Sequence, residues 1–321
     1  MTAGPVSFGL ALQNFTPHSQ EPEFARLASY AVQAEKLGFD SLWAWDHILL
    51  GSKQPFPFLE SLSTLAALAA ITDRVELGTG VLVLPLRNPV VLAKVTSSID
   101  RISGGRLVLG LAAGWYEREF EAVGAPFAGR GGVFERNLDL LIRFWTEHAV
   151  SGQADGMAFR NAVMLPKPAS RPRPRVLIGG YVDRVLRRAA TIGDGWLTYF
   201  YPAESFRSSW RKVRSFAEAA GRDPDELDNL SQLVISIDDS YQRADSRARA
   251  FMDAYFDTPA WSEATQDHAV RGTPEECAEQ LAEHLDAGVR HVALIPADYA
   301  PEQVEVIASD ILPKLRAGAG A

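Results

Sequence analysis

The stretch that decides the fold is LGTGVLVLPLRNP, residues 77–89. It begins as an apolar run typical of a buried strand, yet Gly78 and Gly80 interrupt it, and Pro85 and Pro89 close it. Glycine weakens a strand because it has no side chain to pack. Two glycines so close together therefore indicate either a bulge or a ligand that approaches the bare backbone.

Similar apolar runs recur along the chain, with helical patterns between most of them. Residues 6–12 alternate apolar and other side chains, and residues 24–37 carry apolar side chains three or four apart, so a strand is followed by a helix. Gly38, Gly193 and Gly288 each stand between a helical pattern and a β-rich run, which indicates a repeated helix–glycine–strand join. The predicted strands are 6–12, 40–45, 75–82, 107–112, 175–180, 195–200, 232–237 and 291–296.

Strands that alternate with helices favour parallel pairing through right-handed crossovers, and eight such units suit a closed (β/α)8 TIM barrel of the α/β class. We predict that residues 1–321 form a single barrel domain, with a doubly wound open sheet as the alternative. Residues 150–175 contain prolines and no helical period, so they predict an insertion between units four and five, a hairpin followed by a proline-rich return. Residues 256–272 are also irregular and precede TPEE, residues 273–276, which has the pattern of a capping box.

Composition limits the function classes. The chain is 47% hydrophobic and 22% charged, which is typical of a globular protein with a large core. Its net charge of -8 and its isoelectric point near 5.4 argue against a nucleic-acid partner. Cys277 is the single cysteine, and no secretory leader or membrane-spanning run is evident. We expect a cytoplasmic protein with no membrane partner.

The residues just after the predicted strands are the candidate site, because TIM-barrel enzymes place their active sites at the carboxyl ends of the strands. The candidates at strand ends are Asp46, His47, Ala113, Gly114, Trp115, Gly179, Gly180 and Tyr181, and Thr79 and Gly80 lie inside the third predicted strand. Gly179 and Gly180 precede a helical pattern, where free backbone N–H groups could hold a phosphate; the alternative is a simple strand-to-helix turn.

Other candidates are weighed by residue type. His47 follows an acid at a strand end and could act as a general acid or contact a cofactor, or it could be structural. The histidines form no HxH or HExxH pair, so we expect no catalytic metal, and no G-x-S-x-G motif occurs. Trp43, Trp45, Trp115 and Trp196 fall near strand ends; we expect at least two to pack in the core, and the rest could wall a flat ligand.

A family resemblance is carried by LGTGVLVLPLRNPVVLAKVTSSIDRISGGRLVLGLAAGWYEREFEAVG, residues 77–124, which looks like the bacterial luciferase-like monooxygenase superfamily and its coenzyme F420-dependent oxidoreductase subgroup. GFDSLWAWDH, RPRPRVLIGG, AATIGDGW and GTPEECAEQLAEHLDAGVRHV resemble the successive strand ends of the family in the same order. The resemblance covers most of the barrel.

The resemblance implies a cofactor site at the carboxyl face. It implies a bulge in the third strand with a non-prolyl cis peptide between Gly80 and Val81, which would support the middle of a tricyclic ring. It also implies that Gly179 and Gly180 hold the cofactor phosphate and that Asp46 and His47 contact the ring. Arg87 lies near the expected mouth of the barrel and could meet an anionic cofactor tail. The expected catalytic residues are His47 and Asp46, and the expected cofactor-binding residues are Asp46, Thr79, Gly80, Val81, Ala113, Gly114, Gly179, Gly180 and Tyr181.

The resemblance leaves the chemistry open between two cofactors. With coenzyme F420 the chain would transfer a hydride to or from a small organic substrate; with reduced FMN it would be a two-component monooxygenase. Gly51 and Trp115 stand where several F420-dependent dehydrogenases of the family carry a tryptophan and an acid, which favours reduction of an activated C=C or C=N bond, with His47 or a tyrosine as proton donor.

Two other classes stay open, a non-catalytic flavin-binding barrel and a phosphate-binding lyase barrel. A lyase barrel would require a lysine at a strand end, and none of the eight predicted strand ends clearly has one. A homodimer, and a separate reductase to supply reduced cofactor, are expected by resemblance.

Overall fold

The main sheet closes on itself into a barrel. The computed structural model describes residues 6–16, 20–51, 55–154, 157–255 and 267–318. The barrel strands are β1 (Ser7–Ala11), β2 (Ser41–Ala44), β3 (Glu76–Val83), β4 (Leu107–Ala112), β7 (Arg175–Gly179), β8 (Gly195–Tyr199), β9 (Asp228–Ile237) and β11 (His291–Pro296). They pair in parallel in this order, and the β11–β1 and β8–β9 pairings complete the ring. The closed barrel is confirmed, and the open sheet is excluded.

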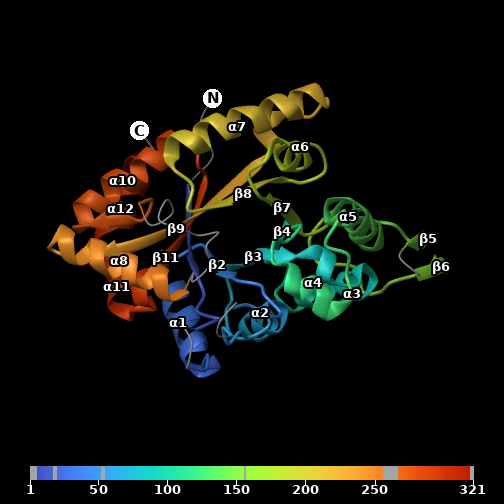
Figure 1. Cartoon of the computed structure of the whole chain (residues 1–321), viewed down its shortest axis with the longest axis horizontal. Coiled ribbons are helices and arrows are strands. Elements are labelled where there is room, and N and C mark those ends of the chain that lie inside the picture. The colour runs from blue at the N-terminus through green and yellow to red at the C-terminus, as the bar shows by residue number, and fades with distance from the viewer. Residues whose placement is uncertain (1–5, 17–19, 52–54, 155–156, 256–266, 319–321) are drawn as a thin grey trace.

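The helices cover the outside of the barrel (Figure 1). They are α1 (Phe24–Lys36), α2 (Ser61–Ala69), α3 (Pro89–Ile102), α4 (Glu117–Val123), α5 (Arg130–Thr146), α6 (Asp183–Thr191), α7 (Ala203–Ala219), α8 (Tyr241–Tyr255), α10 (Pro274–Asp286), α11 (Pro301–Val306) and α12 (Leu312–Gly318). In the part of the chain that the structure describes, none of these helices combines the length and apolar character needed to cross a membrane.

The predicted helix–glycine–strand join is confirmed at all three positions, although the glycines serve it in different ways. Gly38 and Gly288 follow α1 and α10 with φ of +89° and +101°, a left-handed backbone that glycine adopts without a steric cost. Gly193 has no positive φ; a Cβ there would lie 2.7 Å from Ile178 Cγ1, so glycine is needed for close packing of α6 against β7.

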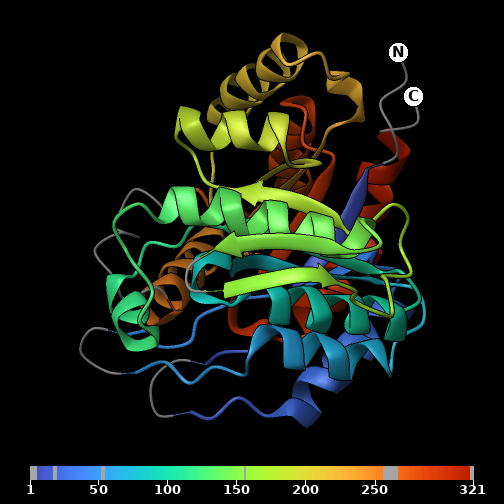
Figure 2. The same ribbon diagram turned by 90° about the vertical axis from the view of Figure 1, so that its right-hand side faces the viewer.

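The predicted insertion is a hairpin that projects beyond α3 and α5 in Figure 1 and faces the viewer in Figure 2. Its strands are β5 (Val150–Ala154) and β6 (Met157–Ala162), and they pair in antiparallel fashion. Phe159 of β6 packs on Phe144 of α5, with ring centroids 5.4 Å apart. The hairpin is therefore held against the outer helical layer, away from the barrel axis.

The second irregular stretch is only partly described. Residues 256–266 lie outside the described residues, and Val270–Gly272 form a short strand, β10, that the sequence did not predict and that pairs with β9. The predicted capping box is confirmed: the Glu276 N–H donates to Thr273 Oγ1, and the Thr273 N–H donates to the Glu276 carboxylate. This box starts α10 at Pro274.

Gly78 makes room for a large side chain inside the barrel. A Cβ at Gly78 would lie 2.2 Å from the Trp43 ring, which fills the barrel interior next to Val108 and Leu177. The first of the two glycines in β3 is thus explained by core packing. The second glycine, Gly80, belongs to the site.

Candidate active site

A cavity of about 430 Å³ opens where the carboxyl ends of β2, β3, β4, β7 and β8 meet the N-termini of α5 and α6. A larger cavity of about 570 Å³ lies between α1 and the loop after β1, and none of the predicted site residues lines it. Because barrel enzymes use the carboxyl ends of their strands, we assign the candidate active site to the smaller cavity.

The structure brings the predicted cofactor residues together. All of them except Thr79 line the cavity, namely Asp46, Gly80, Val81, Ala113, Gly114, Gly179, Gly180 and Tyr181, and His47 lines it as well. Thr79 is fully buried, and its hydroxyl donates to the Gly110 carbonyl at 2.8 Å. Thr79 therefore ties β3 to β4 beneath the cavity instead of facing into it.

The backbone of β3 is distorted where it lines the cavity. The pairing of β3 with β4 shifts register between Thr79 and Leu82, and the Gly80–Val81 peptide bond is cis, as the resemblance implied. Gln232 of β9 reaches across the barrel interior and donates its amide N–H to the Gly80 carbonyl at 3.2 Å. A Cβ at Gly80 would lie 2.9 Å from this amide, so the second glycine of β3 is needed for the contact.

Gly179 and Gly180 form a bare-backbone turn ahead of α6. A Cβ at Gly179 would lie 2.8 Å from Val81 Cγ1, and Gly180 has φ of +132°, where other residues are strained. The first N–H groups of a helix have no partner within the helix and carry partial positive charge. The turn and the α6 N-terminus therefore suit an anionic group such as a phosphate.

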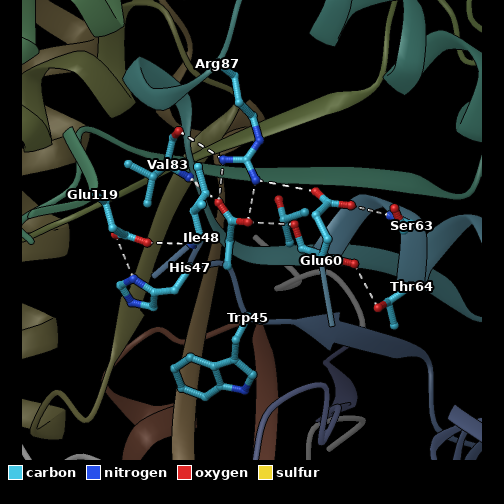
Figure 3. Close-up of polar contacts among 12 residues, drawn as sticks. Trp45, His47, Ile48, Glu60, Ser63, Thr64, Val83, Arg87 and Glu119 are labelled. Atoms are coloured by element: carbon cyan, nitrogen blue, oxygen red, sulfur yellow. Dashed lines mark hydrogen bonds and ion pairs between the residues drawn. The ribbon is translucent and has the colours of Figure 1, made fainter. Parts of the chain in front are cut away.

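His47 is held by Glu119 of α4 (Figure 3). His47 Nδ1 lies 2.9 Å from Glu119 Oε2, and Glu119 Oε1 accepts the N–H groups of Ile48 and Leu49 at 2.5 and 3.0 Å. The Glu119 side chain is 1% exposed. A carboxylate can only accept a hydrogen bond, so Nδ1 carries a proton, and Nε2 is the ring nitrogen that can exchange one with a ligand.

Glu119 is a site residue that the sequence analysis did not predict. It lies four residues beyond Trp115, the position where relatives were expected to carry an acid. An acid is therefore present on the strand-4 side of the site, but it belongs to the first turn of α4. Its carboxylate contacts His47.

Asp46 is fully engaged with protein groups. Its carboxylate accepts hydrogen bonds from Ser61 Oγ at 2.9 Å and the Val83 N–H at 2.9 Å, and it pairs with the Arg87 guanidinium at 2.6 and 2.8 Å. Glu60 lies on the far side of Arg87 at 3.4 Å. Asp46 thus fixes the end of β2 to the end of β3, and Arg87 binds this carboxylate instead of extending toward an anionic tail.

The N-terminus of α5 is a second positive element that the sequence analysis did not predict. Gly129, Arg130 and Gly131 line the cavity. The Arg130 Nε–H donates to the Gly114 carbonyl at 2.9 Å, and its guanidinium lies 4.0 Å from the centre of the Phe127 ring. The cluster of glycines in GRGG, residues 129–132, was a readable signal for a backbone that approaches a ligand.

Arg184 and Arg188 of α6 add two further cations to the cavity wall. The Arg188 Nε–H donates to Glu135 at 2.5 Å, and its Nη2 donates to the Gly131 carbonyl at 3.1 Å, so Arg188 joins α6 to α5. Arg184 is exposed. Two helix N-termini and three arginines thus converge on one end of the cavity.

The aromatic residues divide as predicted. Trp43 and Trp196 are buried in the core, whereas Trp45 and Trp115 line the cavity. Tyr199 also lines it, and burial raises the pKa of Tyr199 to about 12. Burial likewise raises the pKa of Tyr181, whose hydroxyl donates to the Tyr199 carbonyl at 2.5 Å. Both phenols are neutral near pH 7 and are weak proton donors. His47 is therefore better suited than either tyrosine to donate a proton to a substrate.

Among the described residues, no group of three or more His, Cys, Asp and Glu side chains has the arrangement of a metal site.

Comparison with known proteins identifies relatives along the whole chain. The sequence model of the luciferase-like monooxygenase family matches residues 6–291. The chain is 29% identical to an F420-dependent glucose-6-phosphate dehydrogenase of Nakamurella multipartita, over 100% of this chain and 99% of that one. It is 30% identical to a 5,10-methylenetetrahydromethanopterin reductase of Methanolobus tindarius, over 70% of this chain and 65% of the relative.

A solved structure shares the fold. The oxygenating constituent of 3,6-diketocamphane monooxygenase from Pseudomonas putida, in complex with FMN, matches with a TM-score of 0.82 at 18% identity and covers 97% of this chain and 99% of that chain. At 18% identity the likeness shows a shared barrel fold and nothing about function.

Proposed function

The chain belongs to the luciferase-like monooxygenase family and is an oxidoreductase; from this premise we propose that it binds coenzyme F420 and transfers a hydride between the deazaflavin and a small organic substrate. The observation that carries the proposal is the likeness to an F420-dependent dehydrogenase over the full length of both chains. A second relative, the methylenetetrahydromethanopterin reductase, supports reductive chemistry for this chain.

The residues of the cavity fit such a cofactor. Gly179 and Gly180 would bind its phosphate with backbone N–H groups, because side chains there would fill the space. Arg130 and Arg184 would contribute positive charge at the same end. The Gly80–Val81 segment and Ala113 would border the ring, since all of them line the cavity.

We propose reduction of an activated C=C or C=N bond as the reaction. A reduced deazaflavin bound there would supply the hydride for this two-electron reduction, and the protein would have to supply one proton to the neighbouring atom. His47 would deliver that proton from Nε2, with Glu119 holding Nδ1. Asp46 would act by fixing the loop that carries His47, so its direct part in catalysis stays a prediction.

Two alternatives remain in competition. Reduced FMN with dioxygen would make the chain a monooxygenase, and the same fold holds FMN in the diketocamphane monooxygenase component. A non-catalytic flavin-binding barrel would have no need for a histidine oriented by a buried carboxylate, and the His47–Glu119 pair argues against it. A homodimer, a cytoplasmic location and a separate reductase stay predictions.

The proposal is tested by titrating the purified protein with coenzyme F420 and with FMN, each oxidised and reduced, and by following absorbance and fluorescence. Tight binding of F420 and no binding of FMN would support it, and enones and imines would then be screened for turnover. Preference for reduced FMN with consumption of oxygen would replace it by the monooxygenase. Binding of neither cofactor would overturn it.

A further inference from the structure

The part of the cavity next to His47 is walled by aromatic rings. Trp115 packs edge-on to His47, with ring centroids 6.0 Å apart, and Phe58 packs edge-on to its imidazole at 5.6 Å. Trp45 stands two residues before His47, directly after β2, and both residues line the cavity. A ligand that reaches His47 therefore meets indole surfaces.

Trp45 is fixed from behind by further rings. Phe200 stacks on it at 6.4 Å with an interplanar angle of 25°, and Phe15 packs edge-on at 5.7 Å. Phe15 and Phe200 are 2% and 4% exposed. Because these buried rings hold its orientation, Trp45 offers a preformed flat surface rather than a mobile side chain.

The two carboxylates beside His47 are already bound by protein partners. Asp46 pairs with Arg87, and Glu119 binds His47 and two backbone N–H groups. Within the described part of the chain, the arginines that line the cavity come from α5 and α6. Around the barrel, β7, which leads into α6, is three strands from β2, or about 14 Å at the usual strand spacing.

Arg130 of α5 reaches the residue before Trp115, but its Nε–H donates to the Gly114 carbonyl and its guanidinium packs on Phe127. A sugar phosphate bound beside His47 would have to draw Arg130 away from these partners, because burying an unpaired charge is costly. A flat, uncharged ring system would instead replace water on the indole surfaces.

We propose that the substrate of this enzyme is a neutral, flat, conjugated molecule, an aromatic enone or imine, which stacks on Trp45 and Trp115 beside His47. The proposal rests on the function proposed above and names the substrate class of that site. It separates this chain from the relative named for glucose-6-phosphate, because the positive end of the cavity serves the cofactor and the aromatic end serves the substrate.

The test is equilibrium binding by isothermal titration calorimetry to protein loaded with oxidised F420. The probes are benzylideneacetone, a flat aromatic enone; mesityl oxide, which has the same functional group without the ring; and glucose-6-phosphate. We expect benzylideneacetone to bind about 10-fold more tightly than mesityl oxide, a difference within the range of one aromatic contact. Glucose-6-phosphate is expected to show no saturable binding.

Variants test whether the preference for the aromatic enone comes from the aromatic wall formed by Trp45 and Trp115. Trp115→Ala is expected to weaken benzylideneacetone about 10-fold, and Trp115→Phe by less than about 3-fold, because a smaller ring keeps part of the stacking. Tyr241→Ala removes an aromatic ring that is 51% exposed on α8 and does not line the cavity, and it should leave the affinity unchanged. The F420 dissociation constant is measured for each variant as a check on folding.

Two results would overturn the proposal: equal affinity for the two enones, or saturable binding of glucose-6-phosphate that the aromatic enone displaces. Failure of the proposed function is recognised separately, because it shows as an absence of F420 binding. In that case the same three probes are titrated into cofactor-free protein and its variants. The expected affinity ratios between the two enones, and between wild type and the Trp115 variants, stay the same and still test stacking on Trp45 and Trp115.

Discussion

His47 and Glu119, 72 residues apart in sequence, form a hydrogen-bonded pair at 2.9 Å beside the cavity. Glu119 is almost completely buried and is also bound by the N–H groups of Ile48 and Leu49. One carboxylate therefore fixes both the imidazole and the backbone that follows it, which pre-orients Nε2 toward a ligand.

Replacing Glu119 by glutamine should separate these two roles. In Glu119→Gln the amide oxygen can still accept the N–H groups of Ile48 and Leu49, but the amide NH2 then faces His47 Nδ1 and can only donate, so Nδ1 loses its acceptor. We expect kcat to fall by about 100-fold, within the range for general acid–base catalysis, with little change in the F420 dissociation constant. The measurement is steady-state turnover of an enone or imine found in the screen.

The matched control is Glu121→Gln, an exposed acid on the same helix, which should leave kcat unchanged. If Glu119→Gln retained wild-type turnover, His47 would not act through this carboxylate.

The Asp46–Arg87 pair should be a strong contributor to stability. The Asp46 and Arg87 side chains are 1% and 14% exposed, so removing Arg87 leaves a buried carboxylate without its cation. We expect Arg87→Met to lower the free energy of unfolding by about 3–5 kcal/mol, as is usual for a broken buried ion pair. Urea denaturation followed by circular dichroism measures the change.

Two comparisons identify the cause. The double variant Arg87→Met, Asp46→Asn should recover part of the lost stability, because the uncompensated charge is gone. Lys314→Met breaks an exposed pair with Glu275 and should have no measurable effect. An Arg87→Met protein as stable as wild type would show that the pair is not needed for folding.

Gln232 should support the cofactor site from inside the barrel. Gln232→Leu keeps most of the volume but leaves the Gly80 carbonyl without its donor, at a cost of about 1–3 kcal/mol for a buried unpaired group. Because Gly80 lines the cavity, the F420 dissociation constant should also rise several-fold.

Asn229 provides a control on the same strand. Its side chain is fully buried and binds the Gly288 carbonyl and the Arg290 N–H at the opposite end of the barrel. Asn229→Leu should lower stability in a similar way and leave F420 affinity unchanged. Equal effects of both variants on affinity would mean that Gln232 acts only through global stability.

The fold was largely predictable because its signals are local. Short apolar runs mark the barrel strands, and glycines such as Gly38 mark the ends of the helices that precede them. Because barrel enzymes use the carboxyl ends of their strands, the sequence also predicts that His47 and Gly179 belong to one site.

The remaining parts of the site depend on contacts between distant residues. Asp46 looks like a free acid in the sequence, and only the fold shows that Arg87, 41 positions away, neutralises it. Glu119 reads as one acid among several in an amphipathic helix until the barrel brings it to His47. The pairing of Arg188 with Gly131 is similarly long-range, although the GRGG cluster was a local signal that could have been used.

His284 should make the stability of the protein depend on pH. It lies on α10, is 8% exposed, and burial, followed by the neighbouring His268, lowers its pKa from 6.5 to about 4. The unfolded chain therefore binds more protons than the folded one between these two values, so the contribution of His284 to stability is full above about pH 6.5 and is lost as pH falls toward about 4. From pH 7 to pH 5 wild type should lose about 2 kcal/mol through this group.

His284→Leu should lack that loss, so the gap in unfolding free energy between variant and wild type, measured by urea denaturation at both pH values, should shift in favour of the variant. His148→Asn, at an exposed position, should follow the wild-type pH dependence. Parallel pH curves for His284→Leu and wild type would show that His284 does not titrate differently on folding.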